Sequence, residues 1–105
     1  MKNFFTHNFN TFVKLPPLEH IFNSQGKIKI LVELTKNEDL TITSLGKKVK
    51  LNHSNLKGHL NKLCDLNIVI EKRYGRIRIF QINNNSEGGR RIKEFIQFWI
   101  ETYDE

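Results

Sequence analysis

Three leucines at helical spacing, followed at once by an alternating β-prone stretch, are the feature that most constrains the fold of this chain. Leu56, Leu60 and Leu63 stand at positions i, i+4 and i+7, which places them in one narrow stripe along a helix. Asn52 is a good N-cap for that helix, since its side-chain oxygen can accept a hydrogen bond from the first turn. The sequence therefore predicts a helix over residues 52–66 that buries its leucines.

The other faces of this helix are polar, and their side chains should point away from the core. Small polar and basic side chains are the kinds that hydrogen-bond to base edges and phosphates. His53, in the first turn, could donate to a base or a phosphate, and plain solvent exposure is the alternative. The outward set consists of His53, Ser54, Asn55, Lys57, Asn61 and Lys62.

Helical signals also precede this segment. Pro17 suits the first turn of a short helix that runs to Phe22, because proline there loses no hydrogen bond. Ser24 offers a cap for a longer helix over residues 25–36, in which apolar side chains recur at helical spacing. Asn37 offers a stop. We expect the longer helix to pack one face inward.

A second, shorter helix is predicted directly before the leucine-striped one. Residues 40–42 are β-prone, and Thr43 can cap a helix over residues 44–50. Its inward side chains would be Leu45 and Val49. The sequence therefore predicts two helices, over residues 44–50 and 52–66, joined by a tight turn.

The stretch after Asn67 is typical of a β-hairpin. β-Branched and alternating residues occupy 69–73 and 76–82, separated by a turn at Tyr74-Gly75. Basic residues gather at the tip of this hairpin. It is a candidate wing.

A polar linker, residues 83–89, leads to a strongly amphipathic helix over residues 90–103. With Phe98 included, its large apolar residues exceed what one stripe on so small a domain normally buries. We therefore expect this helix to form a homodimer interface. The predicted dimerisation residues are Ile92, Phe95, Ile96, Trp99, Ile100 and Tyr103.

Together these elements predict an α+β fold that is mainly helical, a winged helix-turn-helix with a short strand, a two-stranded wing and a C-terminal dimerisation helix. We expect an arm over residues 1–15, ordered only if its phenylalanines dock, the winged-helix domain over residues 16–83, and the C-terminal helix within residues 84–105. At 105 residues the chain suits one domain with a modest core.

Positive charge is concentrated in the segment that carries the helix-turn-helix and the wing. Residues 47–78 hold nine basic and two acidic residues, a net +7, against +6 for the whole chain. Residues 90–105 are slightly acidic. Any one lysine here would suit an ordinary solvated surface, but the cluster favours double-stranded DNA as the partner.

The predicted DNA-binding residues come from three places: the first helix of the pair, the outward face of the second and the wing. The second helix fits the major groove by its width, and the wing tip reaches adjacent phosphates or the minor groove. The set is Lys47, Lys48, His53, Ser54, Asn55, Lys57, Asn61, Lys62, Arg73, Tyr74, Arg76 and Arg78.

The stretches LGKKVKLNHSNLKGHLNKL (residues 45–63) and RYGRIRIF (residues 73–80) resemble archaeal winged-helix transcription regulators of the ArsR/MarR type. The resemblance covers residues 18–82. It implies a dimeric, sequence-specific regulator that reads the groove with residues 52–62 and places residues 73–78 in the wing.

Two positions depart from the family pattern. Lys50 stands where such turns commonly carry Gly, and a left-handed backbone there costs lysine roughly 1 kcal/mol. Gly58 stands where a basic residue is usual, which removes one candidate contact and lowers helix propensity by about 1 kcal/mol relative to Ala.

Other classes of function find little support in the sequence. No Gly-rich phosphate loop or acid/base pair indicates an enzyme, and no cofactor, metal or small-molecule effector site is evident. His59 is expected to pack, and the single cysteine, Cys64, to lie in the core rather than to sense redox state. No membrane span or signal peptide fits, so a cytoplasmic protein is expected.

Two further binding functions remain open beside sequence-specific regulation. One is a non-specific architectural protein that coats DNA, and the other is a winged helix that binds protein. Loss of the wing arginines should matter to a DNA-binding protein and not to a protein-interaction module.

Overall fold

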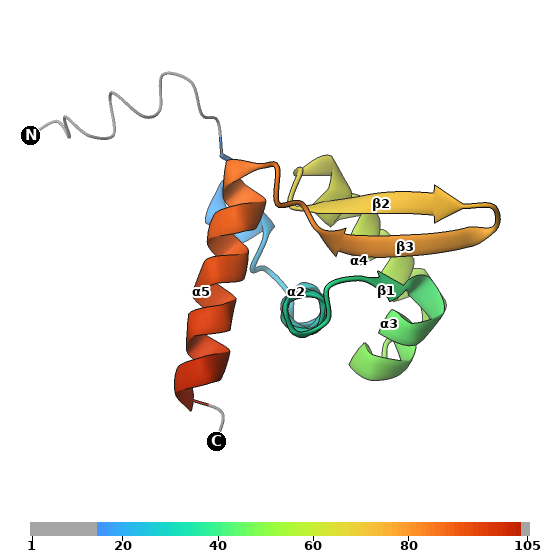
Figure 1. The fold of residues 1–105 in the computed structure, drawn as a ribbon, viewed down its shortest axis with the longest axis horizontal. Coiled ribbons are helices and arrows are strands. Elements are labelled where there is room, and N and C mark those ends of the chain that lie inside the picture. Colours follow the sequence, from blue (N-terminus) through green and yellow to red (C-terminus); the bar gives the residue numbers. More distant parts are fainter. Residues whose placement is uncertain (1–14, 104–105) are drawn as a thin grey trace, which may run out of the picture.

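The computed structural model describes residues 15–103, and within them the predicted α+β winged-helix class is confirmed. Four α-helices, one 3-10 turn and a three-stranded sheet follow one another along the chain (Figure 1). The elements are η1 (Leu18–His20), α2 (Gln25–Lys36), β1 (Leu40–Thr41), α3 (Ile42–Val49), α4 (His53–Asp65), β2 (Val69–Tyr74), β3 (Ile77–Ile82) and α5 (Glu87–Tyr103).

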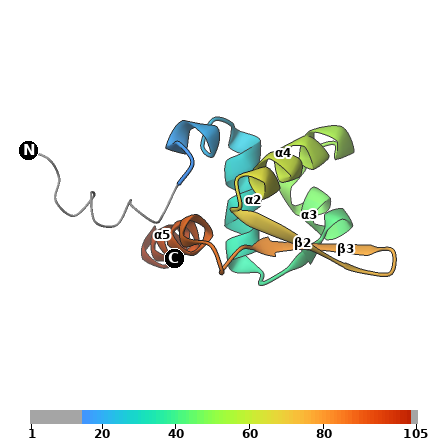
Figure 2. The same cartoon turned by 90° about the horizontal axis from the view of Figure 1, so that it is seen from above.

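Helix α2 lies at the centre of the fold. Ile30, Leu31 and Leu34 are fully buried, and the helix packs against α3, α4, α5 and β3. Figure 2 shows α5 on one side of α2, and α3, α4 and the hairpin on the other. The core therefore continues from the helix-turn-helix, through α2, to the C-terminal helix.

The sheet is antiparallel, with strand order β1-β3-β2. Val69 pairs with Ile82 and Glu71 with Phe80, so these side chains share one face of the hairpin. At the base of the hairpin that face is apolar, since Val69, Phe80 and Ile82 are buried. The hairpin is thus anchored at its base and projects its tip away from α5 (Figure 1).

The helix starts follow capping chemistry. The hydroxyl of Ser24 accepts a hydrogen bond from the Lys27 N–H (3.1 Å), which confirms the predicted cap of α2. The prediction that Thr43 caps α3 is wrong. The hydroxyl of Thr41 accepts from the Ser44 N–H at 3.1 Å, so the helix begins two residues earlier than expected, directly from strand β1.

Helix α5 also begins before the predicted residue 90. The hydroxyl of Ser86 accepts a hydrogen bond from the Gly89 N–H (2.9 Å), and Glu87 places a negative charge in the first turn. The side chain of Glu87 pairs with Arg90 and Arg91. Capping and helix-dipole interactions outweigh the low helix propensity of the two glycines, which had suggested a linker.

The expected short helix from Pro17 to Phe22 is only the single 3-10 turn η1, closed by bonds such as the Ile21 N–H to the Leu18 carbonyl (2.9 Å). Of the predicted arm, only Leu15 is among the described residues. The other fourteen lie outside them.

The junction between α4 and β2 is fixed by a left-handed residue. Asn67 has φ +63°, its N–H donates to the Cys64 carbonyl, and the Ile68 N–H donates to the Leu63 carbonyl (3.0 Å). These bonds are a Schellman motif, and its usual hydrophobic contact fits the burial of Leu63 and Ile68. The Ser86 hydroxyl donates to the Asn67 carbonyl (2.7 Å), which ties the wing base to α5.

The same substitution at two helical glycines should change stability in opposite directions. A Cβ at Gly58 would meet no atom within 4 Å, whereas a Cβ at Gly89 would lie 2.3 Å from the Asn83 carbonyl oxygen. We expect Gly58→Ala to raise the free energy of unfolding by about 0.5–1 kcal/mol and Gly89→Ala to lower it by about 1–3 kcal/mol. Urea unfolding followed by far-UV circular dichroism measures both, and changes of the same sign would contradict this packing.

Candidate nucleic-acid interface

The turn between α3 and α4 sets the angle between the two helices of the helix-turn-helix. Lys50 ends α3 in the left-handed conformation, with φ +57° and ψ +44°. The backbone there is the one that favours Gly, the residue that the resemblance to winged-helix regulators implied for this position. Asn52 then caps α4, its Oδ1 accepting from the Asn55 N–H at 2.8 Å. Both ends of the turn are therefore defined.

Helix α4 presents the predicted polar face to solvent. Leu56, Leu60 and Leu63 are buried, and the six side chains predicted to point outward are exposed. Ser54, Gly58 and Asn61 follow one another at i, i+4 and i+7 along the centre of the exposed face. Because Gly58 has no side chain, the middle of this face is bare backbone that another molecule can approach closely.

The first turn of α2 adds residues that sequence reasoning missed. A hollow of about 380 Å³ lies between the start of α2 and the exposed side of α4. Lys27, only 5% exposed, donates from Nζ to the Asn23 Oδ1 (2.9 Å) and to the His20 carbonyl (3.2 Å). No sequence signal links these segments, because their proximity arises only in the folded chain. The hollow is lined by Asn23, Ser24, Lys27, Ser54, Asn55, Gly58, His59 and Lys62.

His59 packs where α4 meets α2, as predicted from its place beside Leu60. A Cβ added at Gly26 would lie 2.6 Å from the His59 Nε2, so the imidazole fills the space that glycine leaves open. Burial and the nearby Lys27 charge lower the pKa of His59. The neutral imidazole is therefore the form that the fold favours.

The wing turn differs by one residue from the prediction. Tyr74 still belongs to β2 and pairs with Ile77, so the turn residues are Gly75 and Arg76 rather than Tyr74 and Gly75. Gly75 has φ +64° and Arg76 does not have a positive φ, a pattern that fits a type II′ turn with Gly at its first central position. Arg76 is consequently exposed at the tip.

Glu71 holds two arginines on the face of the wing. Its carboxylate accepts from the Arg78 Nε (2.6 Å) and Nη2 (3.3 Å), and from the Arg73 Nε (3.2 Å). These bonds lower the pKa of Glu71, that to Arg78 most strongly. Arg73 and Arg78 are directly paired across the strands, an unfavourable arrangement of like charges that the carboxylate between them offsets.

Arg78 differs from the other predicted DNA-binding residues. Its side chain is only 22% exposed, and its guanidinium lies 5.4 Å from the centroid of the Phe80 ring. Arg78 is thus engaged within the wing, whereas Arg73 is 64% exposed and keeps donors for another partner. The predicted residues that are exposed are Lys47, Lys48, His53, Ser54, Asn55, Lys57, Asn61, Lys62, Arg73, Tyr74 and Arg76.

Neither a reactive cysteine nor a cluster of metal-binding side chains is found in the part of the chain that the structure describes. Cys64 is half-buried against the core, and burial raises the pKa of its thiol, so it lacks the thiolate character of a reactive cysteine. Among residues 15–103, no cluster of three His, Cys, Asp or Glu side chains could hold a metal ion. No helix within those residues is long and apolar enough to span a membrane.

The fold and the comparisons agree on the class of domain. Residues 27–70 match the profile of a protein family described as winged helix-turn-helix DNA-binding. The matched segment runs from the first turn of α2 into β2, so it contains the whole helix-turn-helix. The chain therefore has the winged helix-turn-helix fold, and its residues 27–70 are similar to those of a DNA-binding family. No curated protein sequence is a significant match.

Solved structures of regulators share this fold over most of their length. HlyU from Vibrio cholerae N16961 has a TM-score of 0.68 at 19% identity, and the match covers 84% of this chain and 88% of HlyU. The transcriptional repressor PagR of Bacillus anthracis has a TM-score of 0.66 at 21% identity, covering 92% and 99%. NolR from Sinorhizobium fredii has a TM-score of 0.65 at 21% identity, covering 98% and 95%.

Removing the carboxylate that holds the wing arginines should strengthen DNA binding. Glu71→Gln deletes one negative charge and releases Arg73 and Arg78 toward a phosphate backbone. We expect tighter binding to duplex DNA and a log-log salt slope steeper by about 1. Fluorescence anisotropy at several salt concentrations measures both. Glu94→Gln, which removes the same charge from exposed α5, is the matched control.

The ion pair between Glu71 and Arg78 also predicts how the stability of the fold changes at acid pH. Because the folded-state pKa of Glu71 is lowered, its stabilising contribution is present above the unfolded pKa of about 4.3 and is lost as the pH falls through the folded value. Glu71→Gln should therefore lose less stability than the parent between neutral and acid pH. Equal acid sensitivity would show that this ion pair contributes nothing measurable.

Proposed function

We propose that this chain is a transcription regulator that binds double-stranded DNA sequence-specifically, with α4 in the major groove and the hairpin on phosphates or in the adjacent minor groove. One observation carries the proposal: the exposed polar face of α4 and the exposed Arg76 at the wing tip belong to one unit that is packed on α2. The matched DNA-binding family and the regulator structures support it.

The dimensions and chemistry of α4 suit the major groove. An α-helix with its side chains is roughly 10–12 Å across, and the major groove of B-DNA is about 12 Å wide. Asn55 and Asn61 can pair with adenine edges, and Lys57 or Lys62 with guanine or phosphate. The bare backbone at Gly58 allows the helix to sit deep. We infer that α4 supplies most of the sequence discrimination.

The lysines of α3 and the arginines of the wing would then bind the phosphate backbone of the DNA. Lys47 and Lys48 are exposed on α3, and Arg76 and Arg73 on the hairpin, so positive charge lies on both sides of α4. Phosphate contacts of this kind fix register and orientation, while base contacts specify sequence. Salt should weaken such binding steeply.

The subtype of regulator, the absence of an effector and the cellular location are further parts of this proposal. The resemblance to archaeal ArsR/MarR-type regulators gives the subtype, and no catalytic step or small-molecule effector forms part of the proposed activity. A regulator acts where DNA is, so we place it in the cytoplasm. Binding to DNA as architecture alone, or to protein, would be the competing functions.

A homodimer formed through α5 completes the proposal. The structure divides the predicted dimerisation set, because Ile92 and Ile96 are buried in the protomer's own core and Ile100 packs against it. Four aromatic side chains on the same helix stay more than half exposed, an apolar surface that a monomer rarely leaves uncovered. They are Phe95, Phe98, Trp99 and Tyr103.

The two-fold symmetry of such a dimer would match a palindromic DNA site. Two copies related by a two-fold axis would present two α4 helices to successive major grooves about 34 Å apart, so the preferred site should be roughly palindromic. Phe98, 62% exposed, is the side chain that we place at the centre of the dimer interface.

Lys57→Ala and Arg76→Ala should each weaken binding to duplex DNA by about 1–2 kcal/mol at moderate salt, since each removes a charged contact. Anisotropy titration of labelled duplex measures the change. Lys93→Ala, the same substitution on α5, should leave affinity nearly unchanged.

Selection from a pool of random duplexes separates the remaining functions. A sequence-specific regulator enriches one roughly palindromic site, and Lys57→Ala relaxes that preference. Enrichment of no site with parental affinity retained would indicate an architectural protein. If both alanine variants bound DNA like the parent, the assignment of α4 and the wing would be wrong.

Phe98→Glu should dissociate the dimer, because a charge would be buried at the centre of the interface. Sedimentation equilibrium on the parent is expected to give a dimer and on the variant a monomer. Gln97→Glu adds the same charge at the neighbouring exposed position, about 100° around α5 from Phe98, and should stay dimeric. A monomeric parent at micromolar concentration would contradict the proposed assembly.

A further inference from the structure

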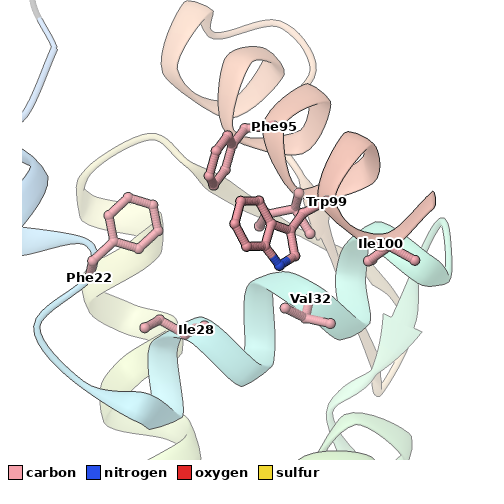
Figure 3. Close-up of a pocket in the computed structure, with 7 residues that line it drawn as sticks. Phe22, Ile28, Val32, Phe95, Trp99 and Ile100 are labelled. Atoms are coloured by element: carbon pink, nitrogen blue, oxygen red, sulfur yellow. The ribbon is translucent and has the colours of Figure 1, made fainter. Parts of the chain in front are cut away.

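An apolar groove runs between α2 and α5, on the opposite side of α2 from the helix-turn-helix. It encloses about 430 Å³, and nearly all of its surface is hydrocarbon or aromatic (Figure 3). The lining side chains are Phe22, Ile28, Val32, Phe95, Ile96, Trp99 and Ile100.

Several lining residues are large and substantially exposed. Phe22 is 36% exposed, Ile28 39%, Phe95 55% and Trp99 56%. The rings of Phe95 and Trp99 lie 5.9 Å apart, tilted by 40°, and form the α5 wall of the groove. Contiguous apolar surface of this kind marks a place where another segment or molecule packs.

We propose that residues 1–14 of the same chain dock in this groove. Phe4, Phe5, Phe9 and Phe12 supply four apolar rings within fourteen residues, and the residues between them are mostly Asn and Thr. Such a segment can bury its rings and leave its polar side chains in water. Its composition is too polar to form a core of its own, so its rings can be buried only against another apolar surface.

The described part of the chain begins beside this groove. A Cβ added at Gly88, in the first turn of α5, would lie 3.5 Å from the Leu15 Cδ2. Figure 1 shows the blue start of the described chain next to that end of α5. Residue 14 is therefore bonded to a residue that lies beside the first turn of α5, the helix forming one wall of the groove.

The arm has the length to reach the far end of the groove. From Gly88 to Trp99 is eleven residues of helix, or about 16 Å. Fourteen residues span up to roughly 46–50 Å when extended and about 21 Å when helical. Phe5, Phe9 and Phe12 stand at intervals of four and three, so a helical turn in the groove would direct three rings to one side.

The shape of the surface favours a connected segment over a second copy. The groove is concave and accepts individual side chains, whereas the Phe98 edge of α5 is not among the lining residues. A tethered segment also needs no second molecule, since its effective concentration is set by the linker. Docking of the arm covers Phe95 and Trp99, so of the four exposed aromatic side chains of α5 it leaves Phe98 and Tyr103 for pairing with a second copy.

The chain contains one tryptophan, Trp99, which lies in the groove and reports its occupancy directly. The experiment measures acrylamide quenching of Trp99 emission, excited where phenylalanine does not absorb, in the full chain over a wide range of protein concentration. The variant carries Phe9→Ser and Phe12→Ser. Its matched control carries Asn8→Ser and Thr11→Ser in the same arm.

We expect Trp99 in the parent and the control to be shielded at every concentration. Each phenylalanine removed should lower the docking equilibrium constant by about tenfold or more, so the double variant should expose Trp99 and raise its quenching constant. Far-UV circular dichroism should show that all three proteins keep a folded helical domain, so that exposure of Trp99 does not come from global unfolding.

Three results would overturn the proposal. Shielding that survives the phenylalanine substitutions but falls on dilution would assign the groove to a second copy of the chain. Shielding that depends on both the phenylalanines and concentration would mean that the arm docks on a partner protomer. Strong quenching of the parent at all concentrations would mean that nothing occupies the groove.

Discussion

The arrangement of this protein depends on burial of the apolar side chains of α2. Ile30, Leu31 and Leu34 have no exposed surface, and they connect the packing of α3 and α4 to that of β3 and α5. Burying such a side chain contributes about 1.5–3 kcal/mol, so α2 fixes the position of α4 relative to the wing more strongly than any surface contact does. The buried side chains of α2 therefore hold the face proposed to meet DNA in its position.

Fewer of the basic side chains around the α2 scaffold are free to bind DNA than the composition suggests. The segment 47–78 has a net charge of +7, but Glu71 binds Arg78 and Arg73, so part of this charge stabilises the wing. Within residues 15–103, the lysines of α3 and α4 and Arg76 at the tip form no ion pair of this kind, and their side chains face solvent. The proposed interface therefore rests on α4 and the wing tip more than on the strands.

Much of the fold was predictable because local chemistry and tertiary packing agree. Ser24 and Asn52 cap the helices that their positions predicted, and the leucines of α4 are buried. The errors fall where two local signals compete: Thr41 and Thr43 both suit a cap, and two glycines beside Ser86 suggested a linker. The position of Lys27 beside α4 could not be predicted, because it depends on packing between segments that are distant in the sequence. The same holds for the groove between α2 and α5.

The central claim is that this chain binds duplex DNA, and one titration tests it most directly. Anisotropy of a labelled mixed-sequence duplex of roughly 30 base pairs is followed as protein is added, at salt concentrations from about 50 to 300 mM. Neutralisation of several phosphates predicts binding at low salt with a log-log slope of about −4 or steeper. No binding even at the lowest salt would contradict the account and would favour a winged helix that binds protein.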